Sequence, residues 1–163
     1  DRADRRDGRP AGECGVKDLV MKPVIDQFMK AIPQMRALGI RYSGAGRDWA
    51  ELTLPWAEKL VAYPGPDGKP GVIASGAIFT LMDSVGGFSV QAARKMPSRI
   101  ATVDLRLDYL RPARPEQTVY GYSKVQKLTR TIAFVRGYAH DGDRDDPVAL
   151  MSGSFMMTSG ATS

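Results

Sequence analysis

Asp83 is the residue whose surroundings in the sequence point most directly to chemistry. Between residues 74 and 93 it is the only side chain that carries a charge, and its neighbours are mostly apolar. An unpaired carboxylate in an apolar interior costs several kcal/mol or stays protonated, so a chain seldom keeps one there without a use. We therefore predict that Asp83 is a general base or a nucleophile in a pocket. The alternative is a structural carboxylate at an interface, satisfied by Ser, Thr or backbone N–H groups.

A second feature lies about two helical turns before Asp83, in the small residues Ser75 and Gly76. If a helix begins here, its first backbone N–H groups lack an acceptor within the helix and carry the positive end of the helix dipole. Such groups can stabilise the negative oxygen that develops when a carbonyl is attacked. Ser75 could equally be an N-cap residue and nothing more.

The element that must position these groups is a long helix over residues 75–95, which Met96 and Pro97 end. Apolar residues recur at helical spacing and little of the remaining surface is charged, which is typical of a helix buried in the middle of a domain. Gly86 and Gly87 in its interior each cost about 1 kcal/mol relative to Ala, so we expect another backbone to approach closely there. The apolar positions are Ala77, Ile78, Leu81, Met82, Val85, Phe88 and Ala92.

The N-terminal part of the chain predicts a tail followed by a helix. Residues 1–18 mix charges with Gly and Pro without periodicity, which indicates a mobile tail that contains the inert Cys14. A helical pattern follows over residues 23–35, with Pro33 interrupting it late and Gly39 ending the segment. We expect residues 19–160 to form one domain.

Two short strands and a long irregular segment are expected before the long helix. The strands cover residues 39–42 and 49–54, around a turn at 43–46. Residues 63–71 contain too much Gly and Pro for regular structure, and no Gly-Lys-Ser/Thr follows as in a phosphate loop. This segment, which begins at Tyr63, either shapes the entrance of a binding site or is a plain surface loop.

Four antiparallel strands are expected after the helix. Residues 101–109 alternate strictly, which predicts one buried face and an opposite face that includes Thr102 and Asp104. Strands over residues 118–128, 131–140 and 147–158 follow through short connections and should form a meander. The fold class is α+β, with an antiparallel sheet packed on a central helix. The residues of the buried face would be Ala101, Val103, Leu105, Leu107 and Tyr109.

Composition excludes several classes of protein. The 163 residues suit one domain, and no apolar run is long enough to span a bilayer. The first eight residues are hydrophilic, one cysteine cannot form an internal disulfide, and a single histidine leaves little for a metal site. We therefore expect a cytoplasmic protein without a bound metal.

The net charge of +5 comes from a basic excess over residues 84–140, which could attract a polyanion. Because no base-stacking or groove-reading motif accompanies it, nucleic acid is the weaker interpretation.

Two motifs together resemble a known family. The family pattern Gly-x-x-His-Gly-Gly, with an acid seven residues after the last Gly, is matched within residues 71–84 at Gly71, Gly76 and the acid Asp83. Residues 102–112 follow Thr/Ser-x-Asp-x-x-x-x-Tyr-x-x-Pro. The sequence from about residue 40 to 157 thus resembles the hot-dog fold acyl-CoA thioesterases of the phenylacetate-pathway type, in which an antiparallel sheet wraps a long central helix.

The resemblance implies hydrolysis of an acyl-CoA thioester in a homodimer or a dimer of dimers, with the active site between protomers and no cofactor beyond the CoA of the substrate. Asp83 would activate water or attack the thioester carbonyl, and the backbone N–H groups of Ser75 and Gly76 would hold its oxygen. Thr102 would help to orient the water. The substrate-binding positions would be Ala74, Ser84 and Tyr109, with Arg111 and Arg114 on the CoA phosphates.

The sequence departs from the family pattern at the start of the helix. Ala74 stands where the family has His, Ser75 replaces the middle Gly, and no Asn occurs between Leu60 and Gly76. Missing positioning groups commonly slow an enzyme by orders of magnitude. The alternative function is therefore a catalytically weak hot-dog protein that binds acyl-CoA or a related ligand as a sensor or carrier.

The remaining chemically capable residues have simpler interpretations. His140 is expected to end a strand at a surface turn, and Asp141, Asp143 and Asp145 to form a solvated turn, because the Gly and Glu of a calcium loop are missing. Three methionines of the last strand are more consistent with core than with an acyl channel; they are Met151, Met156 and Met157.

Overall fold

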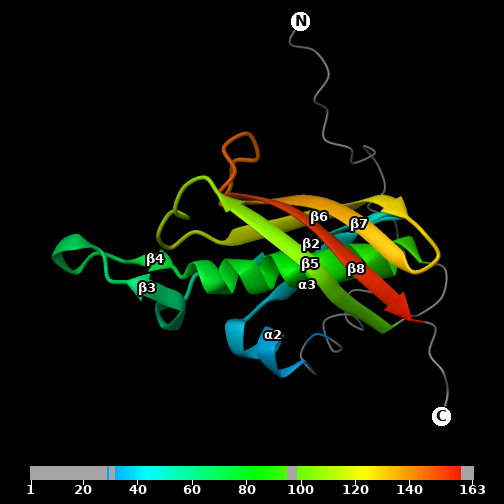
Figure 1. Ribbon diagram of the computed structural model, residues 1–163. Coiled ribbons are helices and arrows are strands. Elements are labelled where there is room, and N and C mark those ends of the chain that lie inside the picture. Colours follow the sequence, from blue (N-terminus) through cyan, green and yellow to red (C-terminus); the bar gives the residue numbers. More distant parts are fainter. Residues whose placement is uncertain (1–28, 30–31, 95–98, 159–163) are drawn as a thin grey trace, which may run out of the picture.

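One long helix lies across a six-stranded antiparallel sheet that curves around it (Figure 1). The computed structural model describes Met29 and residues 32–94 and 99–158. The order of strands in the sheet is β1-β2-β6-β7-β8-β5. The predicted α+β architecture is confirmed, and so is the meander, since β6, β7 and β8 are neighbours. The strands are β1 (Arg41–Ala45), β2 (Trp49–Leu54), β5 (Arg99–Tyr109), β6 (Val119–Leu128), β7 (Ile132–His140) and β8 (Ala149–Thr158).

The long helix is α3 (Ser75–Ala93), in agreement with the helical spacing of its apolar residues. Its fully buried side chains, including Leu81, Met82 and Val85, belong to the same apolar core as inward-facing strand residues such as Leu52 and Phe155. Each such side chain contributes about 1.5–3 kcal/mol when it leaves water. The expectation of a helix buried on every side is wrong for the single chain, because the sheet covers only part of its circumference.

The side of α3 away from the sheet is what we call the open face, and it consists of residues that are exposed or half-buried. Asp83 lies on this face and is half-buried, not sealed in the interior of its own chain. Phe79 is 40% exposed there. The members of the open face are Ser75, Gly76, Phe79, Thr80, Asp83, Ser84 and Gly87.

The two glycines in the interior of α3 have different surroundings. A Cβ atom added to Gly86 would lie 2.5 Å from the ring of Phe155, so the close approach at this position comes from a side chain, not from the backbone that we expected. A Cβ atom added to Gly87 would meet nothing within 4 Å. Within the described part of the chain, no contact accounts for the absence of a side chain at Gly87.

Strand β5 forms one edge of the sheet and pairs only with β8 among the described strands. Its register shifts between Thr102 and Asp104, so a bulge at Val103 interrupts the alternation. Leu105 and Leu107 pack against the core as expected, but Val103 is 59% exposed. The bulge turns Thr102 toward α3, which corrects the face that the sequence pattern assigned to it.

Near the start of the described chain, a short helix α2 (Pro33–Leu38) begins where we expected an interruption. Pro33 occupies the first turn, a position where its missing N–H costs nothing. Gly39 ends the helix with a φ of 74°, as predicted for a C-terminal glycine. The expected turn at 43–46 is mostly strand, because β1 continues to Ala45. The predicted tail at 1–18, Cys14 and the helix end at Met96 and Pro97 lie outside the described residues.

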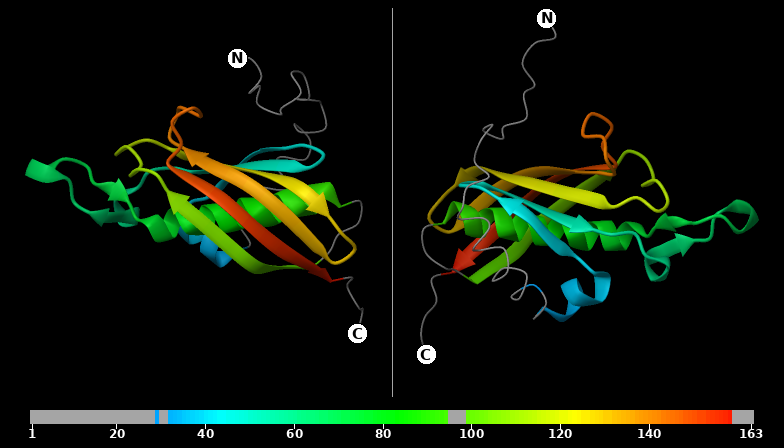
Figure 2. Two further views of the ribbon diagram at one scale, coloured as in Figure 1. Left: turned by 45° about the horizontal axis from the view of Figure 1, so that its top comes forward. Right: turned by 180° about the vertical axis from the view of Figure 1, so that it is seen from behind.

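The segment before α3 is a hairpin that extends past the end of the sheet (Figure 2). Its strands are β3 (Val61–Tyr63) and β4 (Val72–Ile73), preceded by a 3-10 turn at Glu58–Leu60 and joined through another at Pro66–Gly68. The sequence predicted the irregular middle of this segment but missed the two short strands. Neither described helix is long and apolar enough to cross a membrane.

Candidate active site

Asp83 and Thr102 are joined by a hydrogen bond between α3 and β5. The Thr102 hydroxyl donates to Oδ1 of the Asp83 carboxylate over 2.7 Å. Thr102 is exposed and Asp83 is half-buried, so water and a substrate can reach the pair from the open face. The structure thus brings together the two side chains to which the sequence assigned a joint role, and leaves the second carboxylate oxygen open to a reacting molecule.

The first turn of α3 presents two backbone N–H groups that have no acceptor among the described residues. Ala74 is the N-cap residue and has no side chain that could satisfy them. The amides of Ala77 and Ile78 both donate to the Ala74 carbonyl, over 3.0 and 3.4 Å. In the described residues, the amides of Ser75 and Gly76 have no such acceptor, and both residues are exposed. These two amides can therefore donate to an oxygen that gains negative charge, with help from the helix dipole.

The amide of Ser75 and the carboxylate of Asp83 are too far apart to act together within one chain. Eight residues of an α-helix rise about 12 Å along its axis. A general base and an oxyanion donor must each approach one reacting carbonyl to within hydrogen-bond distance. The two groups can complete a single site only if each comes from a different copy of the chain.

A cleft of about 390 Å³ begins at Ser75 and runs between the β3–β4 hairpin and the end of β5. Tyr109 lines it, and its hydroxyl donates a hydrogen bond to the Ser75 carbonyl over 2.8 Å. Partial burial raises the pKa of Tyr109 above its ordinary value, which is already well above neutral pH, so the hydroxyl is protonated and can donate this bond. Tyr109 therefore holds the first turn of α3 against β5. Sequence reasoning missed the hairpin residues of the cleft, Ala62 and Val72, because short strands between prolines carry little periodicity.

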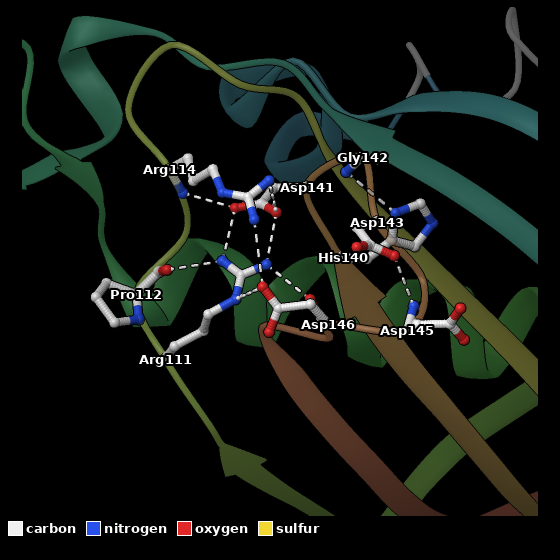
Figure 3. A network of polar contacts seen from close by, with 9 residues as sticks. All are labelled: Arg111, Pro112, Arg114, His140, Asp141, Gly142, Asp143, Asp145 and Asp146. Atoms are coloured by element: carbon white, nitrogen blue, oxygen red, sulfur yellow. Dashed lines mark hydrogen bonds and ion pairs between the residues drawn. The ribbon is translucent and has the colours of Figure 1, made fainter.

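Arg111 and Arg114 are drawn into a network with Asp141 and Asp146, which we call the charged clamp (Figure 3). Arg111 donates to both oxygens of Asp141 over 2.8 and 2.7 Å. The backbone N–H of Arg114 donates to the same carboxylate over 2.7 Å. The clamp ties the segment after β5 to the β7–β8 connection. The Arg111 guanidinium has its partners within the protein, whereas half of the Arg114 side chain is exposed, and the phosphate-binding role of both residues stays a prediction.

Hydrogen bonding within the clamp shifts the pKa values of its buried members. The bidentate contact with Arg111 lowers the pKa of Asp141 to about 2 although burial of the carboxyl acts in the opposite direction. The same contact raises the pKa of the Arg111 guanidinium. Both groups are therefore charged over the whole physiological range.

The β7–β8 connection is less exposed than the sequence suggested. His140 is buried at the end of β7, and its Nδ1 accepts a hydrogen bond from the amide of Gly142 over 3.2 Å. Asp141 is buried in the clamp, so the idea of a solvated turn is wrong for this residue and correct for the exposed Asp143 and Asp145. Of the methionines near the C-terminus, Met151 and Met157 are buried and Met156 is 42% exposed. The described residues contain no cluster of three or more His, Cys, Asp or Glu that could hold a metal ion.

Comparisons with known proteins find similarity to thioesterases. The model of the thioesterase superfamily matches residues 70–148, which include α3 and most of the sheet that follows. The medium/long-chain acyl-CoA thioesterase YigI of Escherichia coli is 29% identical over 139 residues, which cover 78% of this chain and 87% of that protein. A protein of Halobacterium salinarum named as a candidate esterase is 39% identical over 80 residues, but the chain spans only half of its length.

Solved structures give the same fold. A Pseudomonas aeruginosa protein superposes with a TM-score of 0.73 at 31% identity, covering 85% of this chain and 99% of that one. PaaI of Escherichia coli, from the phenylacetic acid degradation operon, superposes with a TM-score of 0.70, covering 86% of this chain and 96% of that one. At 15% identity PaaI supports the fold alone, so the resemblance to the phenylacetate-pathway type goes no further than the fold.

Proposed function

We propose that this chain, which has the hot-dog fold of the thioesterase superfamily, hydrolyses acyl-CoA thioesters at sites formed between two copies. The observation that carries the proposal is the combination on one helix of unused amides at Ser75 and Gly76 with an accessible carboxylate at Asp83. The similarity to YigI supports an acyl-CoA as the substrate, and the name of that relative favours a medium or long acyl chain.

In the proposed reaction Asp83 acts on water at the thioester carbonyl. The Asp83 carboxylate takes a proton from a water molecule while the water oxygen attacks the carbonyl carbon of the thioester. The Ser75 and Gly76 amides stabilise the resulting oxyanion, and Thr102 holds the carboxylate in place through its hydrogen bond to Oδ1. Collapse of the intermediate breaks the carbon–sulfur bond, and the proton held by Asp83 passes to the departing thiolate. Direct attack by Asp83 on the carbonyl is the alternative route and requires the same residue.

A homodimer is part of the proposal because one chain cannot bring Ser75 and Asp83 to a single carbonyl. Two exposed features support pairing on this side of the molecule. Among the described strands, β5 is an edge whose outer side pairs with no other strand, and it carries exposed apolar side chains, including Val103 and Tyr109. The open face of α3 offers Phe79 and the bare position of Gly87. A two-fold arrangement would give each dimer two equivalent sites.

The alternative function, an acyl-CoA sensor or carrier, has one observation in its favour. Ala74 and Ser75 stand where the resemblance implies His and Gly, so two positioning groups are missing from the start of α3. A backbone amide survives the change of its side chain, and the Asp83–Thr102 pair is intact. These features favour the enzyme over the sensor.

The test is release of free thiol from a panel of acyl-CoAs, with Asp83→Asn as the diagnostic variant. We expect the variant to lose a factor of about 10² to 10⁴ in kcat while CoA still binds, because the general base is removed and the shape is kept. Asp145→Asn is the matched control, since Asp145 is an exposed carboxylate in the β7–β8 connection, outside both α3 and β5, and should leave the rate unchanged. Binding without turnover in the parent protein would establish the sensor instead.

A further inference from the structure

The cleft beside Ser75 is built from three segments that are far apart in the sequence. The hairpin contributes Ala62 and Tyr63, the first turn of α3 contributes Ser75 and Ile78, and the chain from Tyr109 onward forms the opposite wall. Its volume of about 390 Å³ is within the range of small-molecule sites. The cleft therefore begins at the proposed oxyanion donor and leads away from it.

Hydrogen bonds and close backbone contacts fix both walls of this cleft. The Trp56 indole donates to the Gly71 carbonyl over 2.9 Å and anchors the base of the hairpin. A Cβ atom at Gly71 would lie 2.0 Å from the Tyr63 carbonyl oxygen, so only glycine lets the two hairpin strands approach this closely. On the other wall, the Leu110 amide donates to the Val148 carbonyl over 2.9 Å. A preformed cleft binds its ligand without a large cost of ordering.

The lining of the cleft is mainly apolar, and two of its polar groups are already engaged. The Tyr109 hydroxyl donates to the Ser75 carbonyl, and the Arg111 guanidinium is held by the charged clamp. An acyl-CoA offers two parts that could lie here, the acyl chain and the pantetheine arm. The pantetheine arm carries two amides, whose burial without hydrogen-bond partners would be unfavourable. A hydrocarbon chain needs no such partners.

We infer that this cleft binds the hydrocarbon chain of the acyl group and that its hairpin wall, at Ala62 and Tyr63, sets the chain length that the protein prefers. The inference rests on the proposed function, because it assumes that the thioester carbonyl lies at the Ser75 amide. From that point the cleft directs the chain along Ile78 toward the hairpin. Tyr63 lines the cleft and is 75% exposed, so a ligand in the cleft can contact its ring directly.

The experiment compares saturated acyl-CoAs from acetyl to palmitoyl in the parent protein and in Ala62→Trp. Ala62 is exposed and lines the cleft, so an indole there fills the cleft without disturbing the core. In the parent protein kcat/KM should rise about two- to fourfold per added methylene until the cleft is full. We expect Ala62→Trp to lower kcat/KM for long chains at least tenfold and to leave acetyl-CoA within about twofold. Lys69→Trp is the matched control, because Lys69 is exposed near the hairpin tip and does not line the cleft.

A second variant and a binding measurement separate the possible failures. Tyr63→Ala should flatten the dependence on chain length by removing the exposed wall. Loss by the same factor for every acyl-CoA in Ala62→Trp would place the pantetheine arm in the cleft and overturn the inference, as would no loss at all. If the parent protein hydrolyses no acyl-CoA, the proposed function fails. In that case, the affinities of the same acyl-CoAs, measured by calorimetry with free CoA as reference, test whether the cleft binds the acyl chain. Only an acyl site gives an affinity that rises with chain length and falls in Ala62→Trp.

Discussion

The charged clamp and the open face of α3 both contain a carboxylate in a hydrogen bond, but the two carboxylates have very different surroundings. In the clamp, the Asp141 side chain is 0% exposed and its oxygens receive hydrogen bonds from Arg111 and from the Arg114 backbone. On the open face, Asp83 is half-buried and accepts a bond from the neutral Thr102 hydroxyl. A carboxylate whose lone pairs are occupied by hydrogen bonds from cationic residues stabilises the fold and has no free lone pair to offer a substrate. One that keeps a lone pair open toward solvent is free to react.

The difference also explains which charges the sequence could identify as functional. The basic excess over residues 84–140 suggested ligands for phosphate, yet Arg111 is used inside the protein. Asp83 has no cation beside it in the sequence or in an ion pair of the described structure. A charged side chain without an oppositely charged partner in its own chain indicates a functional site more strongly than a regional excess of positive charge does.

The largest expected effect comes from Ser75→Pro, the first of two variants that together test whether a second copy completes the site on the open face. Ser75→Pro removes the proposed oxyanion donor, and Ala74 has φ −59° and ψ 136°, a conformation compatible with a following proline. Proline is also favoured in the first turn of a helix, so the variant should fold. We expect thiol release to fall about 10²-fold or more, as for other oxyanion donors.

Mixing Ser75→Pro with Asp83→Asn sharpens this test. In a mixed dimer one of the two shared sites keeps both an intact amide and an intact carboxylate. We therefore expect co-expression and purification of the mixed dimer to restore about half of the parent rate per dimer, although each variant alone is slowed about 10²-fold or more. A mixed dimer as inactive as either parent variant would mean that the two groups do not act across a subunit boundary.

A substitution in the charged clamp should change the stability of the fold and not the rate of hydrolysis, and this is the second largest expected effect. The folded pKa of Asp141 is lowered to about 2, below its ordinary value, so its contribution is present above about pH 4 and is lost as the pH falls toward 2. We expect Asp141→Asn to lower the free energy of unfolding by about 3 kcal/mol at neutral pH, measured by chemical denaturation. The difference between parent and variant should shrink as the pH falls below about 4.

Asp108→Asn is the control for this prediction. Asp108 pairs with Arg106 on the surface, where the two side chains are 53% and 72% exposed. Exposed pairs contribute little, so we expect a change of less than about 1 kcal/mol. An equal effect of the two substitutions, or a difference at Asp141 that does not change with pH, would contradict the contrast between a buried and an exposed ion pair.

Much of the fold followed from local pattern, and the exceptions depend on contacts between distant residues. The period of α3 and the tight turn between β6 and β7 are properties of neighbouring residues, so the sequence predicted both. The bulge at Val103 is not, because nothing in a strictly alternating strand marks where its partner loses register. That bulge decides that Thr102 faces Asp83. The pairing of Arg111 with Asp141 joins residues thirty positions apart, for which composition gives no signal. The sequence thus identified the carboxylate that reacts in our proposal but could not tell which of its cations are already used.

The smallest expected effect comes from two adjacent glycines, Gly86 on the buried side of α3 and Gly87 on its open face. Gly86→Ala should destabilise the fold by about 1–3 kcal/mol, because the new methyl group would meet the buried Phe155 ring. Gly87→Ala adds a methyl group that meets nothing among the described residues, so helix propensity alone predicts a gain of about 1 kcal/mol. If the open face packs against a second copy, that methyl group instead obstructs the partner, and we expect the dimer to dissociate about tenfold more readily in sedimentation equilibrium. A more stable protein with unchanged self-association would show that Gly87 faces water in the assembled molecule, and the shared site would then have to be built along β5 without this part of the helix.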